Sequence, residues 1–409
     1  MHSSMRKNTI RISFTGDLLV YHSQIKKSKT RSGYDFSHIF EQIRFLFNKS
    51  DYVIGNLETP LAGKEAGYTV MDMLFNTPDQ FAVDVKNAGF TMLTTANNHC
   101  MDKGQSGLER TIDVLDRVGI DHTGTFKSLS DSHAFIKDIS NVKFGVVSFT
   151  YGTNPNVNGY TIDEQNDYMV NLTMKSKPGY RRPFWKQFFI NLLYRLPKSL
   201  QDLVHPLYPD YGYDDCVDKV EIFNPDNEKY ILNLRNLIIQ TKSEADVVFV
   251  CLHSGGQFNS VIGEYTQYLL QEIRRCNVDG IIVNHPHCVL SSVFKDNHFE
   301  AWSLGNFCFT PLEGYFIEGV YGEYGIVVHL DCDVALKKIV EICFSVVKNV
   351  RLTDGRSQVI SVDSLYENTI DGKEKEMIRK DLMQVISRFL DTEIELVEIK
   401  SEYNIKEFK

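Results

Sequence analysis

A recurring arrangement constrains the fold of this chain more than any other feature: short apolar runs end in polar residues that can bind a metal ion. The runs end at Asp17, at Glu58, at Asn98-His99, at His253 and at His285-Pro286-His287. Segments with apolar residues at helical spacing lie between these runs, so that strands and helices alternate. This alternation predicts an α/β fold, whose sites lie beyond the carboxyl ends of its strands.

The same periodicities place the expected elements along the chain. Strands are expected at residues 11–19, 52–55, 91–95, 142–149, 247–252, 280–283, 300–304, 324–330 and 338–348. Helices are expected at residues 36–47, 78–88, 104–119, 230–241, 265–277 and 374–390. Residues 8–350 are predicted to form one domain with an inserted segment at 155–220. Residues 351–409 are predicted to form a helical C-terminal extension packed on that domain.

Composition argues against several classes of function. A net charge of −9 does not suit general nucleic-acid binding, which needs a basic domain. The eight cysteines include no C-x-x-C pair and lie mostly in apolar runs, which is typical of buried free thiols in a reducing compartment. The N-terminus is polar and no run reaches about 18 apolar residues, so we expect no secretory signal, no transmembrane helix and a cytoplasmic location.

The polar strand ends combine carboxylates, imidazoles and carboxamides, the ligand types used for Mn, Fe, Zn or Mg. Each residue alone has a structural explanation; Asp17, for example, suits a helix N-cap or a turn. The strongest single motif is His285-Pro286-His287, because an extended segment directs residues i and i+2 to the same side. The metal prediction depends on recurrence, since four of only 12 histidines directly follow apolar runs.

Seven blocks of sequence carry a resemblance to a known family. They are Phe14-Thr15-Gly16-Asp17, residues 54–61, residues 95–99 with Asp102, Gly104 and Gly107, and residues 150–154, 253–258, 284–289 and 303–307. In order and spacing they resemble the CapA-type family of poly-γ-glutamate capsule-synthesis proteins. That family is similar to calcineurin-like metallophosphoesterases, so the resemblance implies a four-layer αββα sandwich with a metal site at the strand ends.

The resemblance also implies roles for individual residues. It assigns metal binding, by one or two divalent ions of Mn, Zn, Mg, Fe or Ca, to Asp17, Glu58, Asn98, His253, His285 and His287. It assigns catalysis to His99 as general acid or base, to Asp102, which would orient it, and to His22. It assigns substrate binding to Asn56, Tyr151, Asn154 and Asn306, of which Asn306 is also a candidate to orient a ligand.

One departure from the phosphoesterase pattern concerns the number of ions. Asn56 stands where phosphoesterases carry the aspartate that bridges two metals, and Glu58 is the nearby carboxylate. Bridging two cations normally requires an anionic oxygen, which a carboxamide lacks. A single ion, or one strong and one weak site, is therefore as well supported as two strong sites.

The inserted segment has a composition of its own. No Asp or Glu occurs between Asp167 and Asp202, and residues 175–198 interleave Lys and Arg with aromatic side chains. A basic amphipathic helix in an acidic protein can lie on an anionic membrane, here the inner face. It can equally hold an anionic substrate, or it can be a packed insertion with a solvated basic face.

Three functions stay open after this comparison of motifs. The favoured one is a metal-dependent enzyme that acts on an amide or peptide-like substrate in the synthesis of poly-γ-glutamate or a related polymer. A phosphoesterase or a metal-dependent peptide epimerase is the first alternative, and a non-catalytic assembly factor of a polymer-synthesis complex is the second. The expected partner is an anionic polymer or peptide rather than nucleic acid.

Overall fold

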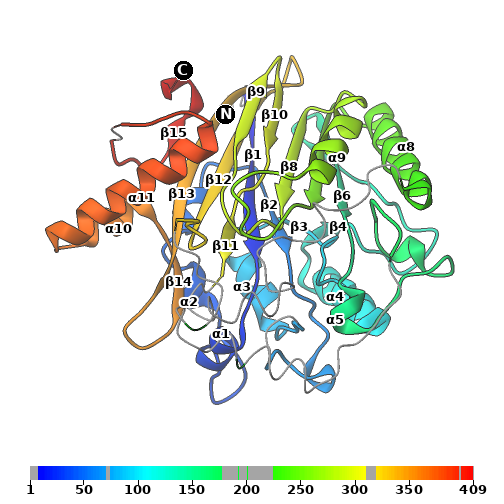
Figure 1. Ribbon diagram of the computed structural model, residues 1–409, viewed down its shortest axis with the longest axis horizontal. Helices are drawn as coiled ribbons and strands as arrows, with labels where there is room; N and C mark the ends of the chain where they lie inside the picture. Colours follow the sequence, from blue (N-terminus) through cyan, green and yellow to red (C-terminus); the bar gives the residue numbers. More distant parts are fainter. Residues whose placement is uncertain are drawn as a thin grey trace, which may run out of the picture.

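Two β-sheets face each other at the centre of the computed structural model (Figure 1), which describes residues 8–70, 74–176, 192, 200, 224–309, 319–395 and 398–408. The first sheet has the order β14-β13-β12-β1-β2-β3-β4, with β11 paired to β1 and β15 paired to β13. Its strands are β1 (Thr9–Leu18), β2 (Tyr52–Leu57), β3 (Met92–Thr94), β4 (Asp121–Thr123), β11 (Asn306–Cys308), β12 (Tyr324–Asp333), β13 (Lys338–Arg351), β14 (Ser357–Ser361) and β15 (Tyr403–Asn404). The adjacent strands β1 to β4 are parallel, as the alternation of strands and helices predicts.

The second sheet has the order β5-β6-β7-β8-β10-β9. Its strands are β5 (Phe135–Ile139), β6 (Val142–Thr150), β7 (Val247–His253), β8 (Gly280–Asn284), β9 (Ser292–Lys295) and β10 (His298–Ala301). The inner strands β6, β7, β8 and β10 are parallel, and an antiparallel strand closes each edge. The carboxyl ends of β7 and β8 therefore meet at one edge of this sheet.

Helices cover the outer face of each sheet (Figure 1). The α-helices are α1 (His22–Lys27), α2 (Ser37–Phe40), α3 (Gln80–Ala88), α4 (Gly104–Val118), α5 (Pro155–Asn158), α8 (Glu228–Glu244), α9 (Glu264–Arg274), α10 (Val362–Asn368) and α11 (Gly372–Leu390). The short 3₁₀ helices are η1 (Arg44–Phe47), η2 (Lys64–Ala66), η3 (Asp167–Met169), η7 (Pro225–Asn227) and η9 (Ile405–Phe408).

Alternating apolar side chains build the layers. Ile12 and Phe14 of β1 face the second sheet, where the Phe14 ring meets Phe249 edge-on at 4.9 Å. Residues of α2, α3 and α4 form a separate core on the outer face of the first sheet, and residues of α8 and α9 form another on the second. This arrangement confirms the predicted four-layer αββα sandwich.

The C-terminal region also joins the core between the layers. Leu382, Ile386 and Phe389 of α11 belong to the same apolar cluster as the inner residues of β12 and β13. Phe389 lies 5.1 Å from the ring of Phe344. The helix thus covers the part of the first sheet that extends beyond the second, while the division at residue 350 stays a prediction.

Several expected elements differ from those observed. The strand expected at 300–304 ends earlier, at Ala301 of β10, and a separate strand of the other sheet, β11, begins at Asn306. Gly305 (φ 71°) lies between them, where the chain crosses from one sheet to the other. The helix expected at 36–47 is divided into α2 and η1. Most of the basic and aromatic insertion at 175–198 lies outside the described residues. No helix in the described part of the chain is long and apolar enough to cross a membrane.

Candidate metal centre

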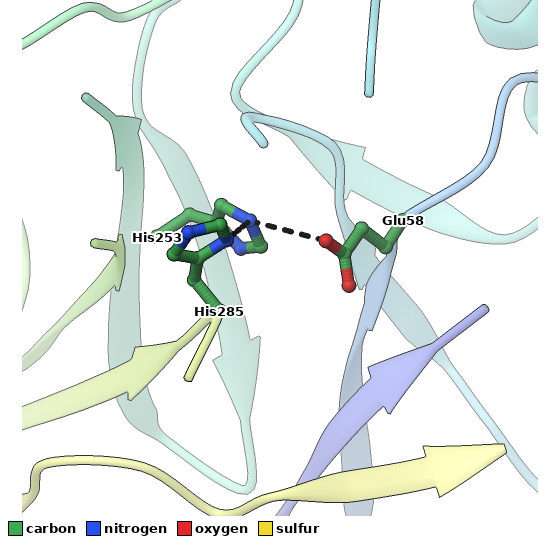
Figure 2. A group of neighbouring side chains, drawn as sticks. All are labelled: Glu58, His253 and His285. Carbon is green, nitrogen blue, oxygen red and sulfur yellow. Dashed lines mark hydrogen bonds and ion pairs between the residues drawn. The ribbon is translucent and has the colours of Figure 1, made fainter. Parts of the chain in front are cut away.

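The polar strand ends meet between the two sheets rather than along one edge. In the first sheet the register places Asp17 beside both Asn56 and Asn306. In the second sheet it places His253 beside Asn284. The two sets face each other, because β1, β2, β7 and β8 all end on the same side of the sandwich. Figure 2 shows the imidazoles of His253 and His285 opposite the carboxylate of Glu58.

Two groups of side chains could each hold a cation. Glu58, His253 and His285 form the first group, and Asp17, Glu58 and His287 form the second. Within each group the candidate ligand atoms lie within 4.8 Å of one another. All five side chains are buried, and Glu58 belongs to both groups. The residues predicted as ligands therefore converge on a single carboxylate.

The surroundings of Glu58 fit a bound cation. Both of its carboxylate oxygens are buried, and neither accepts a hydrogen bond from the described residues. Its Oε1 lies 3.4 Å from Nε2 of His253 and 3.7 Å from Nε2 of His287. A buried carboxylate without hydrogen bonds is costly, so buried charges are normally paired or bind a metal. Two carboxylates with three imidazoles are a suitable donor set for Mn, Fe or Zn.

Asp17 and His287 show how burial acts on the second group. Burial and the neighbouring charge of Glu58 raise the pKa of Asp17 well above its usual value, despite hydrogen bonds from Asn56 and the His285 amide. Burial lowers the pKa of His287 to about 4, which keeps its imidazole neutral, as a metal ligand must be. A bound cation would lower the pKa of Asp17, because its positive charge favours the ionised carboxylate.

Asn306 determines which nitrogen of His287 is available. Its amide nitrogen donates to the backbone oxygens of His287, at 2.9 Å, and Gly322, at 2.8 Å. Its Oδ1 therefore accepts from Nδ1 of His287 at 2.9 Å. That bond places the proton on Nδ1 and leaves Nε2 with a free lone pair. Asn306, predicted to bind substrate or orient a ligand, thus has the contacts of an orienting residue.

Asn56 lies between ligands of the two sheets, with its amide nitrogen toward them. That nitrogen donates to Asp17 at 2.7 Å and lies 3.3 Å from Nδ1 of His253. Its Oδ1 faces Thr94 Oγ1 and the amide of Asn97, at 3.3 and 3.4 Å. In this orientation Asn56 offers no oxygen to a cation or a substrate. Glu58 is the carboxylate that the two ligand groups have in common.

The turn after β3 brings in Asn98 and the predicted catalytic pair. Oδ1 of Asn98 lies 2.9 Å from Nε2 of His253, next to the first group. Nδ1 of His99 donates to Asp102 at 2.8 Å. Burial alone lowers the pKa of His99, but the charge and hydrogen bond of Asp102 outweigh burial and raise it. The raised pKa favours the protonated ring, while the role of His99 as general acid or base stays a prediction.

Asn97 has the sequence context of a turn former, yet its side chain supports this turn. Its amide donates to the backbone oxygen of Leu57 at 2.7 Å, and its Oδ1 accepts from the His99 amide at 3.1 Å. Asn97 thus ties the end of β2 to the turn that carries Asn98 and His99. The signal for this role in the sequence was the position of Asn97 directly before Asn98.

Three other predicted site residues belong to neither ligand group. His22 is exposed at the start of α1, and its Nδ1 bonds the carbonyl of Thr69 at 3.0 Å. Tyr151 is half-buried, with its ring 5.0 Å from that of His285. Asn154 begins α5 with φ 51°, and its buried Nδ2 has no partner among the described residues. The structure therefore places Tyr151 at the centre, but not His22.

The segment His285-Pro286-His287 is not the extended strand end that the sequence predicts. His285 has φ 108° and His287 has φ 54°, so the backbone makes a turn. The carbonyl of Pro286 accepts from the Phe258 amide at 2.7 Å, which ties the turn to the segment after β7. Because of this turn, each imidazole enters a different ligand group.

Comparisons with known proteins agree with these motifs. The family model described as bacterial capsule synthesis protein PGA_cap matches residues 11–311. The chain is 26% identical to the PGA biosynthesis protein CapA of Bacillus subtilis over 73% of its length, and 24% identical to the capsule biosynthesis protein CapA of Bacillus anthracis over 73%. It spans 62% and 59% of those relatives. A solved structure from Thermus thermophilus, TT1561, matches 81% of this chain and 97% of its own at 7% identity, with a TM-score of 0.34, too low to support an assignment.

Proposed function

Because the chain belongs to the PGA_cap family of bacterial capsule synthesis proteins, we propose that it acts in the synthesis of poly-γ-glutamate or a related capsule polymer. In this proposal it is a metal-dependent enzyme whose substrate is an amide or peptide-like chain. The names of the two Bacillus relatives support the pathway, and the buried ligand groups support the metal dependence.

The position of Glu58 carries the proposal. It contributes to both ligand groups, and its two oxygens have no hydrogen-bond donors among the described residues. A carboxylate with these properties can bridge two cations, whereas Asn56 directs a nitrogen toward the centre. We therefore favour two ions with Glu58 as their common ligand. A structural carboxylate would need its own donors.

Different side chains around the centre supply different parts of the proposed chemistry. When bound, the divalent ions would polarise a carbonyl or phosphoryl oxygen and lower the pKa of a bound water. His99 can donate a proton, because Asp102 holds the ring and favours its charged form. Burial of every ligand excludes bulk water and strengthens each charge interaction.

A phosphoesterase is the second candidate, favoured by the calcineurin-like sandwich and the Asn98-His99 pair beside His253. The two candidates predict different substrates for the same centre. A phosphoesterase should hydrolyse an activated aryl phosphate once metal is supplied, and His99→Ala should abolish that activity. The amide-acting enzyme should instead cleave or modify a γ-glutamyl peptide.

Metal content tests the proposal directly. Wild-type protein and Glu58→Gln should be purified without added metal and then dialysed with Mn²⁺ or Zn²⁺. We expect close to two ions per chain in the wild type and a loss of both in Glu58→Gln, measured by elemental analysis. His22→Ala is the matched control, because it removes a predicted site histidine that lies outside both groups. Equal metal content in all three proteins would overturn the proposal.

A further inference from the structure

Asn284 is a buried carboxamide beside the first ligand group, and the proposed chemistry gives it no role. It is the last residue of β8, and the register of the second sheet pairs it with His253 of β7. The residue is only 6% exposed, and its buried Oδ1 accepts no hydrogen bond from the described residues. A buried acceptor without a donor is unfavourable, and an ion is one of the partners that can satisfy it.

Strand alternation places the Asn284 side chain on the inner face of the second sheet. Along β8, Ile282 belongs to the core between the two sheets, whereas the residues before and after it belong to the core under α8 and α9. Successive side chains of a strand point to opposite faces, so Asn284 faces the same side as Ile282. That is also the side on which His253 meets Glu58 (Figure 2). Asn284 and His253 are therefore neighbours on the face that carries the first ligand group.

The other neighbours of His253 show what distinguishes Asn284. Thr150 of β6 is paired with His253 from the opposite side, but its hydroxyl bonds the carbonyl and the amide of Gly152 at 3.0 and 3.4 Å. The predicted ligand Asn98 directs its Oδ1 to Nε2 of His253 at 2.9 Å. Of the two residues paired with His253 in the sheet, Asn284 is thus the one whose side-chain oxygen has no partner among the described residues.

The donor set of the first group indicates what an additional oxygen would do. Glu58, His253 and His285 supply one carboxylate and two imidazoles, the combination found at non-haem Fe²⁺ sites. The carboxamide oxygens of Asn98 and Asn284 would add two donors to these three and bring the total to five. Zn²⁺ sites in proteins are mostly four-coordinate, so a fifth donor matters more to Fe²⁺ than to Zn²⁺.

We infer that Oδ1 of Asn284 is a further oxygen ligand of the ion in the first group, where it favours Fe²⁺ over Zn²⁺. This inference rests on the proposed function, because it adds a ligand to the same metal centre. It also accounts for the buried oxygen, which gains a partner when the ion binds. Asn284 should therefore contribute to stability in the metal-loaded protein and not in the metal-free protein.

Removal and replacement of the oxygen test the ligand role. Asn284→Leu keeps the branched shape of the side chain without its oxygen, and Asn284→Asp keeps an oxygen. In anaerobic titrations of metal-free protein, Asn284→Leu should lower the Fe²⁺ affinity of one of the two ions by ~100-fold or more, beyond the effect of a residue that only supports a ligand. Its Zn²⁺ affinity should fall much less, because four donors stay in place. Asn284→Asp should bind Fe²⁺ at least as tightly as the wild type.

Three outcomes of these titrations would overturn the inference. The first is an unchanged Fe²⁺ affinity in Asn284→Leu. The second is an equal loss for Fe²⁺ and Zn²⁺, which would show that the substitution only displaces His253. The third is the same loss of Fe²⁺ affinity in Asn284→Asp as in Asn284→Leu, which would show that an oxygen at this position does not bind the ion.

Asn171→Leu is the matched control for stability. Asn171 is 7% exposed, but its Oδ1 accepts from Nδ1 of His133 at 2.7 Å and its amide donates to the backbone oxygen of His133 at 3.3 Å. In metal-free protein Asn171→Leu should lower the urea midpoint and Asn284→Leu should not, because only the first variant breaks hydrogen bonds. Saturating Fe²⁺ should then raise the midpoint of Asn284→Leu by less than that of the wild type or Asn171→Leu. A metal-free Asn284→Leu protein that unfolds as early as Asn171→Leu would show that the oxygen already has a partner, and would overturn the inference.

The same titrations separate a failure of this inference from a failure of the proposed function. A wild type that binds two ions, together with an Asn284→Leu variant that binds them equally well, would remove Asn284 from the ligands and leave the proposed function intact. A wild type that binds none of Fe²⁺, Mn²⁺ and Zn²⁺ would defeat the proposed function, and the ligand role of Asn284 with it.

Discussion

The two ligand groups of the centre share Glu58 but differ in charge, in origin and in the side chains that surround them. The first group takes His253 and His285 from the ends of β7 and β8 in the second sheet, and it faces Tyr151. The second takes Asp17 from β1 of the first sheet, together with His287 beneath Phe258 and Phe309. One group is thus richer in imidazole and borders Tyr151, whereas the other is richer in carboxylate and packs against apolar rings.

This difference in side chains suggests that the two groups bind different cations. Two carboxylates suit a hard cation such as Mn²⁺ or Mg²⁺, and two imidazoles suit Zn²⁺ or Fe²⁺. The second group packs against the rings of Phe258 and Phe309, whereas the half-buried ring of Tyr151 borders the first. We therefore expect the two groups to prefer different divalent ions.

The largest expected effect is the loss of one ion when a residue that belongs to only one group is substituted. His285→Ala should remove the ion of the first group and Asp17→Asn the ion of the second, so that each variant keeps one of the two. Each substitution should lower the affinity for its ion by more than the roughly 10–100-fold typical of residues that only support a ligand. Titration with Co²⁺, followed by its absorption spectrum, distinguishes imidazole-rich from carboxylate-rich coordination. Loss of both ions in either variant would contradict the prediction that the two groups bind their ions independently.

The stability of the metal-free Asp17→Asn variant serves as its folding control. Because the folded pKa of Asp17 is raised, its ionised form is disfavoured in the folded state. Its contribution to stability is full below the unfolded pKa, about 3.9, and is lost as pH rises through the folded pKa. At pH 7 the metal-free Asp17→Asn protein should therefore be at least as stable as the wild type, as measured by urea unfolding.

Local sequence patterns were sufficient to predict the alternation of strands and helices and most of the candidate ligands, whereas the four-layer sandwich was implied by the family resemblance. Apolar alternation and helical spacing are local properties, and a polar residue directly after an apolar run lies at a strand end wherever the strand pairs. Asp17, Glu58, His253 and the histidine pair were identified in this way, and the structure groups them. Their common position follows from topology, because parallel strands end on the same side.

What the sequence missed depends on contacts between distant segments. The shared position of Glu58 and the turned carboxamide of Asn56 result from how two sheets face each other, which no local pattern reports. The positive φ of His285 is maintained by a hydrogen bond from Phe258 to Pro286, so the assumption of an extended segment was wrong. His22 follows Asp17 closely in sequence, but α1 carries it to the surface.

An intermediate effect concerns acid, and it compares His287 with a histidine outside the centre. Burial lowers the pKa of both His287 and His329 from 6.5 to about 4. Each stays neutral in the folded protein while the unfolded chain takes up a proton, so stability falls as pH drops from about 6.5 to 4. The loss is on the order of 3 kcal/mol for each residue.

Urea unfolding of metal-free protein between pH 7 and 4 measures this loss. His329 lies between Ser13 and Ser345, at 2.7 and 3.3 Å, away from both ligand groups. His329→Asn should remove one part of the acid sensitivity and leave metal content unchanged, whereas His287→Asn should remove a similar part and also lose the ion of the second group. Identical pH profiles in the wild type and both variants would refute the lowered pKa values.

The smallest expected effect tests whether the second group depends on the orientation of His287. Asn306→Ala removes the acceptor for Nδ1 of His287, so the ring loses its fixed tautomer. Affinity for the ion of the second group should fall roughly 10–100-fold while the first group is unaffected. Asn349→Ala is the matched control, because Asn349 is also buried and its side chain bonds the backbone carbonyl of Asn306 at 3.4 Å rather than the His287 ring. Both variants should lose about 1–3 kcal/mol of stability from buried groups left without partners. An equal loss of metal affinity in the two would mean that Asn306 acts only through folding, and the difference between the two groups in how their histidines are oriented would lose its support.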